Sequence, residues 1–192
     1  MESRDIFSLE DSESHVRKSI DSTSNITLSM LCTPPYNPSP EFIKYRVPFI
    51  RGLDAEILFF LGPLINPLEE ETGLPTNIYT ALYEAIRNAF QHGNQKDLKK
   101  PVHFYIKKGA PLEFLIEDQG GSIDPLFASF ILLQRQKGRG DALLDFYAFA
   151  QRAKPEKNNG TGTSFIFQYS DRVFYYRSNT SGLIVHIIAP QG

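Results

Sequence analysis

Cysteine and histidine are scarce in this chain of 192 residues, which contains one cysteine, Cys32, and four histidines. A single cysteine cannot form an intrachain disulfide, which fits a reducing compartment. The cysteine and histidines also lack the spacing typical of zinc ligands. Cys32 lies in a proline-rich segment with no base nearby in sequence, so we do not expect a thiol nucleophile.

Long apolar segments and a strong excess of one charge are also missing. The longest apolar stretch, residues 55–65, contains Glu56, Gly62 and Pro63 and is too short to span a bilayer. The first residues are charged and contain no apolar signal-peptide region. The net charge of −2 does not indicate nucleic acid or an anionic membrane as a partner. We therefore expect a cytoplasmic protein that binds neither nucleic acid nor membranes.

The composition divides the chain into two parts. Residues 1–40 are rich in Ser, Thr, Asp and Glu, and residues 34–40 contain four prolines. This proline density is incompatible with a regular helix or a central strand. We predict a disordered or loosely attached extension over residues 1–40 and one globular domain over residues 41–192.

The hydrophobic pattern of the second part predicts two helices followed mainly by paired strands. Gly93 suits a left-handed residue at the end of the second helix. The order of elements predicts an α+β fold, a two-layer sandwich with helices on one face of a mostly antiparallel sheet. We expect helices at 53–71 and 76–91, and strands at 42–50, 102–107, 112–117, 172–177 and 183–189.

The second helix carries the most informative polar residues of the chain. Glu84, Asn88 and His92 recur every four residues and therefore share one helical face. An apolar stripe beside them should face the core. Spacing of this kind is also typical of an ordinary solvated face, so a functional assignment of these residues depends on the wider motif.

The letters E-x-x-x-N-A-x-x-H-G-N, which run from Glu84 to Asn94, resemble the N-box of the GHKL ATPases. Within that superfamily they are most similar to the anti-sigma-factor serine kinases. The resemblance implies the Bergerat fold, ATP and Mg²⁺ as cofactors, Asn88 as the magnesium ligand and Glu84 as the general base. Mg²⁺ prefers oxygen ligands, and a carboxylate near the phosphates can deprotonate an attacking hydroxyl.

A second motif follows the strand expected at 112–117. Asp118 and Gly120 resemble the Asp-x-Gly-x-Gly box of the same family, although the place of its second glycine is occupied by Ser122. The resemblance implies that Asp118 accepts a hydrogen bond from the exocyclic amine of adenine and that Gly120 lets the backbone approach the nucleotide. Asp124 either belongs to this box or caps the next helix.

The family closes its site with a lid that ends in a glycine-rich turn, for which the chain offers two candidates. One is Gly138-Arg139-Gly140, and the other runs from Gly160 through Thr161 and Gly162 to Thr163. The second agrees better with the C-terminal end of the family, so we expect Gly160, Thr161 and Gly162 to hold phosphates.

That assignment makes residues 121–159 a long lid, with helices expected at 125–134 and 141–152. From Gln134 to Lys157 it has six cations, among them Arg139 and Arg152, against three anions. A basic lid would suit a triphosphate, although an ordinary solvated helix pair has similar charges. Arg139, which lies between two glycines, is the residue that we most expect to contact a phosphate.

The resemblance implies an ATP-dependent serine kinase that phosphorylates an antagonist protein and alternately binds a sigma factor, as a possible homodimer. An alternative is a regulator with a degenerate nucleotide site. The conformation of its partner-binding surface would depend either on bound ATP or on no nucleotide at all. A weaker third hypothesis is the detached catalytic part of a histidine kinase.

Overall fold

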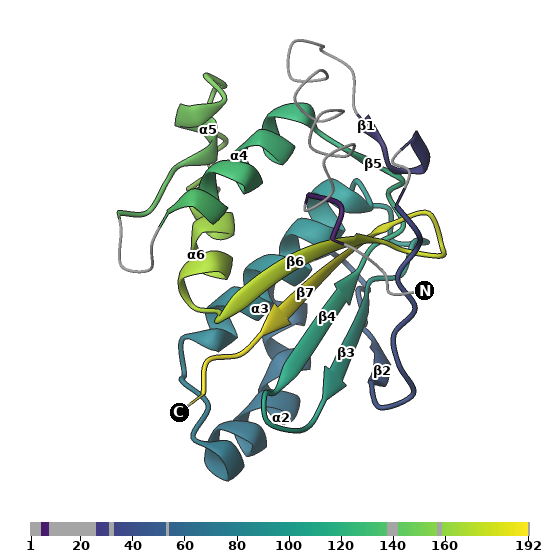
Figure 1. Cartoon of the computed structure of the whole chain (residues 1–192), viewed down its shortest axis with the longest axis vertical. Coiled ribbons are helices and arrows are strands. Elements are labelled where there is room, and N and C mark those ends of the chain that lie inside the picture. The colour runs from purple at the N-terminus through teal and green to yellow at the C-terminus, as the bar shows by residue number, and fades with distance from the viewer. Residues whose placement is uncertain are drawn as a thin grey trace.

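The computed structural model describes residues 5–7, 26–30, 33–52, 54–137, 142–156 and 159–191. Within these residues, one five-stranded sheet has only antiparallel neighbours (Figure 1). In sheet order, its strands are β2 (Ile43–Arg46), β3 (His103–Lys107), β4 (Glu113–Glu117), β7 (Leu183–Ile188) and β6 (Arg172–Arg177). Each strand falls within or close to a range expected from the sequence.

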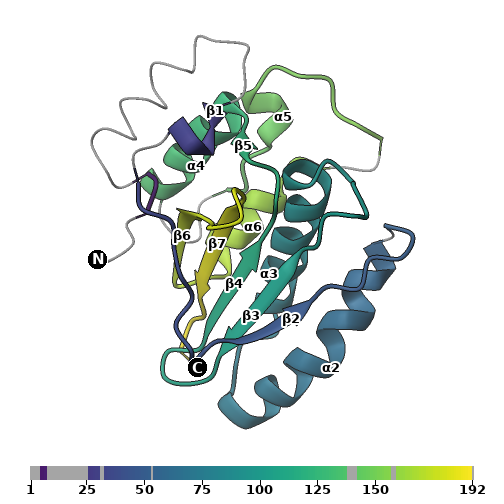
Figure 2. The same cartoon turned by 90° about the vertical axis from the view of Figure 1, so that its right-hand side faces the viewer.

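Helices cover one face of this sheet and form the second layer (Figure 2). Side chains alternate along each strand, as β4 illustrates. Phe114 and Ile116 belong to the main core with the helices, whereas Leu115 lies in a smaller cluster on the other face. The covering helices are α2 (Asp54–Thr72), α3 (Ile78–Asn88) and α6 (Gly162–Gln168). The α+β two-layer fold is therefore confirmed.

The helix α2 is continuous although it contains Pro63 and Pro67. Proline cannot donate to the carbonyl one turn earlier, so both positions interrupt the hydrogen-bond ladder. Burial of one apolar face offsets this loss. The fully or nearly fully buried residues of α2 recur at helical spacing and are Ile57, Leu61, Ile65 and Leu68.

The helix α3 changes its winding at its C-terminal end. It is followed by one π-helical turn, η2 (Ala89–Gly93), a type of turn that is frequent at functional sites. The left-handed conformation expected at Gly93 occurs instead at Gln95 and Lys96, with φ of 54° and 61°. The prediction for Gly93 is therefore wrong, because the wider turn delays the reversal of the chain.

Above the end of the sheet, the lid is built on a two-stranded sheet and two helices (Figure 1). Its elements are β5 (Ser122–Ile123), which pairs with β1 (Ile26–Thr27), then α4 (Pro125–Gln136) and α5 (Phe146–Phe149); the 3₁₀ turn η1 (Leu28–Met30) follows β1. The helix expected at 141–152 is thus a single turn within its described part. Asp145 caps that turn at its start, and Gln151 ends it by adopting a φ of 52°.

The described parts of the N-terminal extension pack on the domain, which differs from the loose attachment expected for them. Ile6 and Phe7 are buried, and the Ile6 N–H donates to the Tyr175 carbonyl at 2.8 Å. Tyr36 stacks on Tyr176 across the outer face of the sheet, with 4.5 Å between ring centroids. Composition did not predict these contacts because only a few isolated apolar residues make them.

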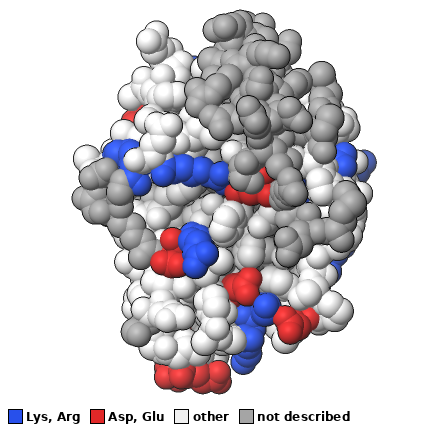
Figure 3. All heavy atoms as spheres, viewed as in Figure 1, with Lys and Arg blue, Asp and Glu red and all other residues white. Residues whose placement is uncertain are grey.

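Charges of both signs are interspersed on the face shown in Figure 3, and acidic side chains gather at its lower end. This distribution agrees with the small net charge of the chain. Among the helices in the described ranges, none combines the length and apolar character needed to cross a membrane.

Candidate nucleotide-binding site

A cavity of about 350 Å³ lies between α3, the end of β4 and the lid, a size typical of small-molecule sites. Glu84, Asn88 and His92 all line this cavity, as expected from their shared helical face. Asp118 lines it as well. The fold therefore brings the residues of the two predicted motifs to one hollow.

The Asp118 carboxylate is held at the end of β4 by backbone donors. Its Oδ1 accepts hydrogen bonds from the N–H groups of Gly120 at 2.8 Å and Leu183 at 3.2 Å. Burial raises the pKa of Asp118 from 3.8 to about 6; the charge of Glu117 adds to the rise, while both N–H groups and Lys100 oppose it. No other hydrogen bond reaches this side chain within the described residues, so Oδ2 accepts none there.

Three glycines allow the chain to pack closely around Asp118. A Cβ atom at Gly93 would overlap Asp118 Oδ2, and one at Gly120 would overlap the Gly93 carbonyl. A Cβ atom at Gly182 would overlap the Asp118 carbonyl. Gly120 itself does not line the cavity, so its visible role is to let the Asp118 loop approach η2.

Glu84 is a partly buried carboxylate on the wall of the cavity. Burial raises its pKa, and the nearby charge of Asp54 acts in the same direction, while Arg87 lowers it. The Arg87 Nη1 atom lies 3.6 Å from Glu84 Oε2. Gly162 packs so closely against Glu84 that a Cβ atom there would overlap Oε2. The glycine-rich turn thus lies directly beside the proposed base.

The turn at residues 160–163 lies at the cavity, where Gly160, Gly162 and Thr163 line the wall. Thr161, which we also expected to hold phosphate, does not line it. Gly160 has a φ of 71°, a conformation that favours glycine. The competing candidate at 138–140, including Arg139, lies outside the described residues.

The lid contributes to the cavity one of the cations noted in the sequence and an apolar surface that we did not predict. Arg152 lines the cavity, pairs with Asp124 and lies 5.9 Å from the Phe146 ring centroid. Asp124 also accepts from the Leu126 N–H at 2.9 Å, so it caps α4. The apolar lid residues at the cavity include Ile123, Phe127 and Phe146. Repeated phenylalanines in the lid were the available sequence signal.

Ser164 attaches this lid to α6. Its buried hydroxyl oxygen accepts hydrogen bonds from Gln134 Nε2 at 2.6 Å and from the Leu144 N–H at 3.0 Å. The hydroxyl also donates to the Leu144 carbonyl at 2.9 Å. One side chain therefore connects α4, the segment before α5 and the helix that follows the glycine-rich turn.

Fold and cavity together define a two-layer α+β domain with a hollow of small-molecule size beneath its lid. Comparison with known families matches residues 66–189 to the histidine kinase-like ATPase domain. This range covers well over half of the chain and includes every residue that lines the cavity. The chain belongs to the histidine kinase-like ATPase family. No curated protein sequence matches it.

Membership of this family implies ATP binding, and the residues present fit the nucleotide and its usual Mg²⁺. The Asn88 side chain lines the cavity without a hydrogen-bond partner among the described residues, so its amide oxygen is available to a cation. In the described ranges, no group of three His, Cys, Asp or Glu side chains could hold a metal. A cation at Asn88 would therefore depend on phosphate oxygens for further ligands.

Proposed function

We propose that this protein is an ATP-dependent serine kinase of the anti-sigma-factor type. The observation that carries this proposal is that Glu84, Asn88 and Asp118 line one cavity. A candidate base, a candidate magnesium ligand and a candidate purine acceptor therefore border the same space. Phosphoryl transfer depends mainly on such positioning and on electrostatic stabilisation.

Each of these side chains has a distinct role in the proposed reaction. Asp118 accepts from the exocyclic amine of adenine through Oδ2, and Asn88 holds Mg²⁺ through its amide oxygen. Bound Mg²⁺ would neutralise charge on the phosphates. Glu84 orients the attacking serine hydroxyl and takes its proton. Its raised pKa makes it a stronger base than an exposed carboxylate.

The glycine-rich turn and Arg152 form the phosphate end of the proposed site. Gly160 and Gly162 let the backbone approach a ligand, and Arg152 supplies a positive charge at the cavity wall. The substrate would be a serine on an antagonist protein, and a sigma factor would be the alternative partner. The chain itself would act as a homodimer. These partners are proposed from the similarity of the N-box to that of the anti-sigma-factor kinases.

A transfer assay with γ-labelled ATP and the antagonist protein tests this function. Asn88→Ala should reduce transfer by about 100-fold or more, because it removes the proposed metal ligand. Asn179→Ala is the matched control, since that exposed amide bonds to Asn37 away from the cavity. Full transfer by Asn88→Ala would refute the assignment.

One observation favours a second candidate, a regulator that binds nucleotide without transferring phosphate. Glu84 already has Arg87 as an ionic neighbour and Gly162 packed against Oε2. If this arrangement persists with nucleotide bound, Glu84 Oε2 stays against Arg87 and Gly162 and does not take a proton from a serine hydroxyl. ATP would then raise the thermal stability of the protein, while labelled phosphate would remain on ATP in the presence of the antagonist.

A further inference from the structure

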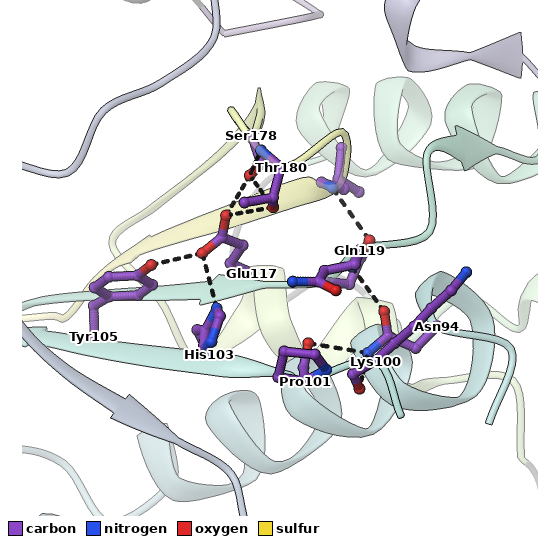
Figure 4. A network of polar contacts seen from close by, with 11 residues as sticks. Asn94, Lys100, Pro101, His103, Tyr105, Glu117, Gln119, Ser178 and Thr180 are labelled. Atoms are coloured by element: carbon purple, nitrogen blue, oxygen red, sulfur yellow. Dashed lines mark hydrogen bonds and ion pairs between the residues drawn. The ribbon is translucent and has the colours of Figure 1, made fainter. Parts of the chain in front are cut away.

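The end of the N-box helix contains a buried amide whose hydrogen bonds lead to the loop of Asp118. Asn94 has no exposed surface. Its Nδ2 group donates to the carbonyl oxygens of Lys100 at 2.9 Å and Pro101 at 3.2 Å. Its Oδ1 atom accepts from the backbone N–H of Gln119 at 2.7 Å (Figure 4).

These three hydrogen bonds join parts of the chain that are distant in sequence. They connect the residue after η2, the segment that enters β3, and the residue that follows Asp118. A primary amide can donate twice and accept at the same time, which neither a hydroxyl nor an ionised carboxylate can do. The residue type at this position is therefore determined by three backbone groups.

We infer that Asn94 is a positioning residue for purine recognition, an inference that rests on the proposed ATP-binding function. Asp118 lies between two constraints. On one side, its backbone N–H donates to the Leu183 carbonyl at 3.0 Å, and on the other, Asn94 fixes the next peptide. The orientation of Oδ2 in the cavity follows from both. Without Asn94, the loop can rotate and Oδ2 loses its alignment with the exocyclic amine of adenine.

A nearby network provides a comparison for a purely structural role. Glu117 precedes Asp118, and alternation along β4 directs its side chain to the other face of the sheet (Figure 4). Its Oε2 accepts from the Tyr105 hydroxyl at 2.6 Å. Tyr105→Phe therefore removes a buried hydrogen bond close in sequence to Asp118 but outside the cavity.

The test measures ADP and IDP binding to the full chain by calorimetry in the presence of Mg²⁺. IDP carries hypoxanthine, which lacks the exocyclic amine. The ratio of the two dissociation constants therefore measures how well the protein distinguishes adenine from hypoxanthine. Asn94→Ser should reduce the preference for ADP by about tenfold, mainly through weaker ADP binding. Asn94→Asp keeps an acceptor for the Gln119 N–H but loses the two donors to Lys100 and Pro101 that hold the side chain in place, so it should reduce the preference as well. Tyr105→Phe should retain the ratio of the unmodified protein.

The possible outcomes separate this inference from the proposed function. If the unmodified protein binds neither ADP nor IDP, the proposed function and the positioning role of Asn94 are both wrong. If it prefers ADP and the Asn94 variants keep that preference, only the inference is wrong. Should neither variant fold, NMR of the unmodified protein decides instead. The Asn94 Nδ2 and Gln119 N–H resonances should then shift differently with ADP and IDP, and identical shifts would overturn the positioning role.

Discussion

The buried carboxylate of Asp118 should lower the stability of the nucleotide-free protein at neutral pH. Its pKa is about 6 in the folded state against an ordinary value of 3.8. The folded state therefore binds the proton more tightly than the unfolded chain does. The stabilisation by that proton is complete below pH 3.8 and is lost as the pH rises through 6, a change of about 3 kcal/mol.

Asp118→Asn removes this dependence while keeping an oxygen that can accept from Gly120 and Leu183. The amide and the protonated carboxyl are both neutral acceptors, and the pKa of about 6 already includes the stronger hydrogen bonds that the carboxylate accepts. At pH 8 the variant should therefore exceed the unmodified protein in stability by about 3 kcal/mol. At pH 5 the carboxylate is mostly protonated, and the advantage should shrink by roughly 1.4 kcal/mol.

Denaturant unfolding of both proteins without nucleotide at pH 8 and pH 5 provides the measurement. Other groups titrate in this range, but they are common to both proteins and cancel in the difference. A stability difference that does not change with pH would contradict the buried charge. In a second measurement, excess ATP should stabilise the unmodified protein by about 3 kcal/mol at a hundredfold excess over its dissociation constant. The variant should lose much of that gain because its amide presents a donor to the amine of adenine.

Three further substitutions test the base, the lid and the N-terminal segment. Gly162→Ala should displace the Glu84 carboxylate and reduce phosphate transfer about tenfold or more. Its matched control is Gly62→Ala in α2, where an added Cβ meets nothing within 4 Å apart from the chain neighbours, and it should leave transfer unchanged; equal transfer by both variants would refute the contact. Ser164→Ala should speed hydrogen exchange of residues 142–156, because it removes the connection between the lid and α6; unchanged exchange would show that other contacts hold the lid. Phe7→Ala should lower the free energy of unfolding by about 3 kcal/mol, whereas an unaltered melting temperature would mean that this segment is not part of the folded domain.

Local patterns were sufficient for the strands of the main sheet and for the helical face shared by Glu84 and Asn88. Glu84 and Asn88 share a face because four residues complete about one helical turn, and this holds through all of α3. Asp118 follows β4, a short strand whose last four residues are all buried. The placement of both motifs at one cavity was anticipated only through the resemblance to a family, because spacing along the chain does not specify which elements meet.

Other features depended on contacts that local patterns do not encode. The left-handed residues moved from Gly93 to Gln95 and Lys96 because η2 is wound more widely than an α-helix. The helix expected at 141–152 became a single turn, which the sequence alone could not show. Its start is capped by Asp145, and Gln151 leaves the helical conformation.

The sequence by itself determined the α+β class, the amphipathic helix with Glu84 and Asn88, and the carboxylate at the end of β4. These features follow from periodicities of two and 3.6 residues and from short motifs. Only the tertiary structure decided that Asn94 fixes the Asp118 loop, that Gly162 lies against Glu84, and where the first described residues pack. Such contacts join segments far apart in the chain, so their geometry exists only once the core has brought those segments together.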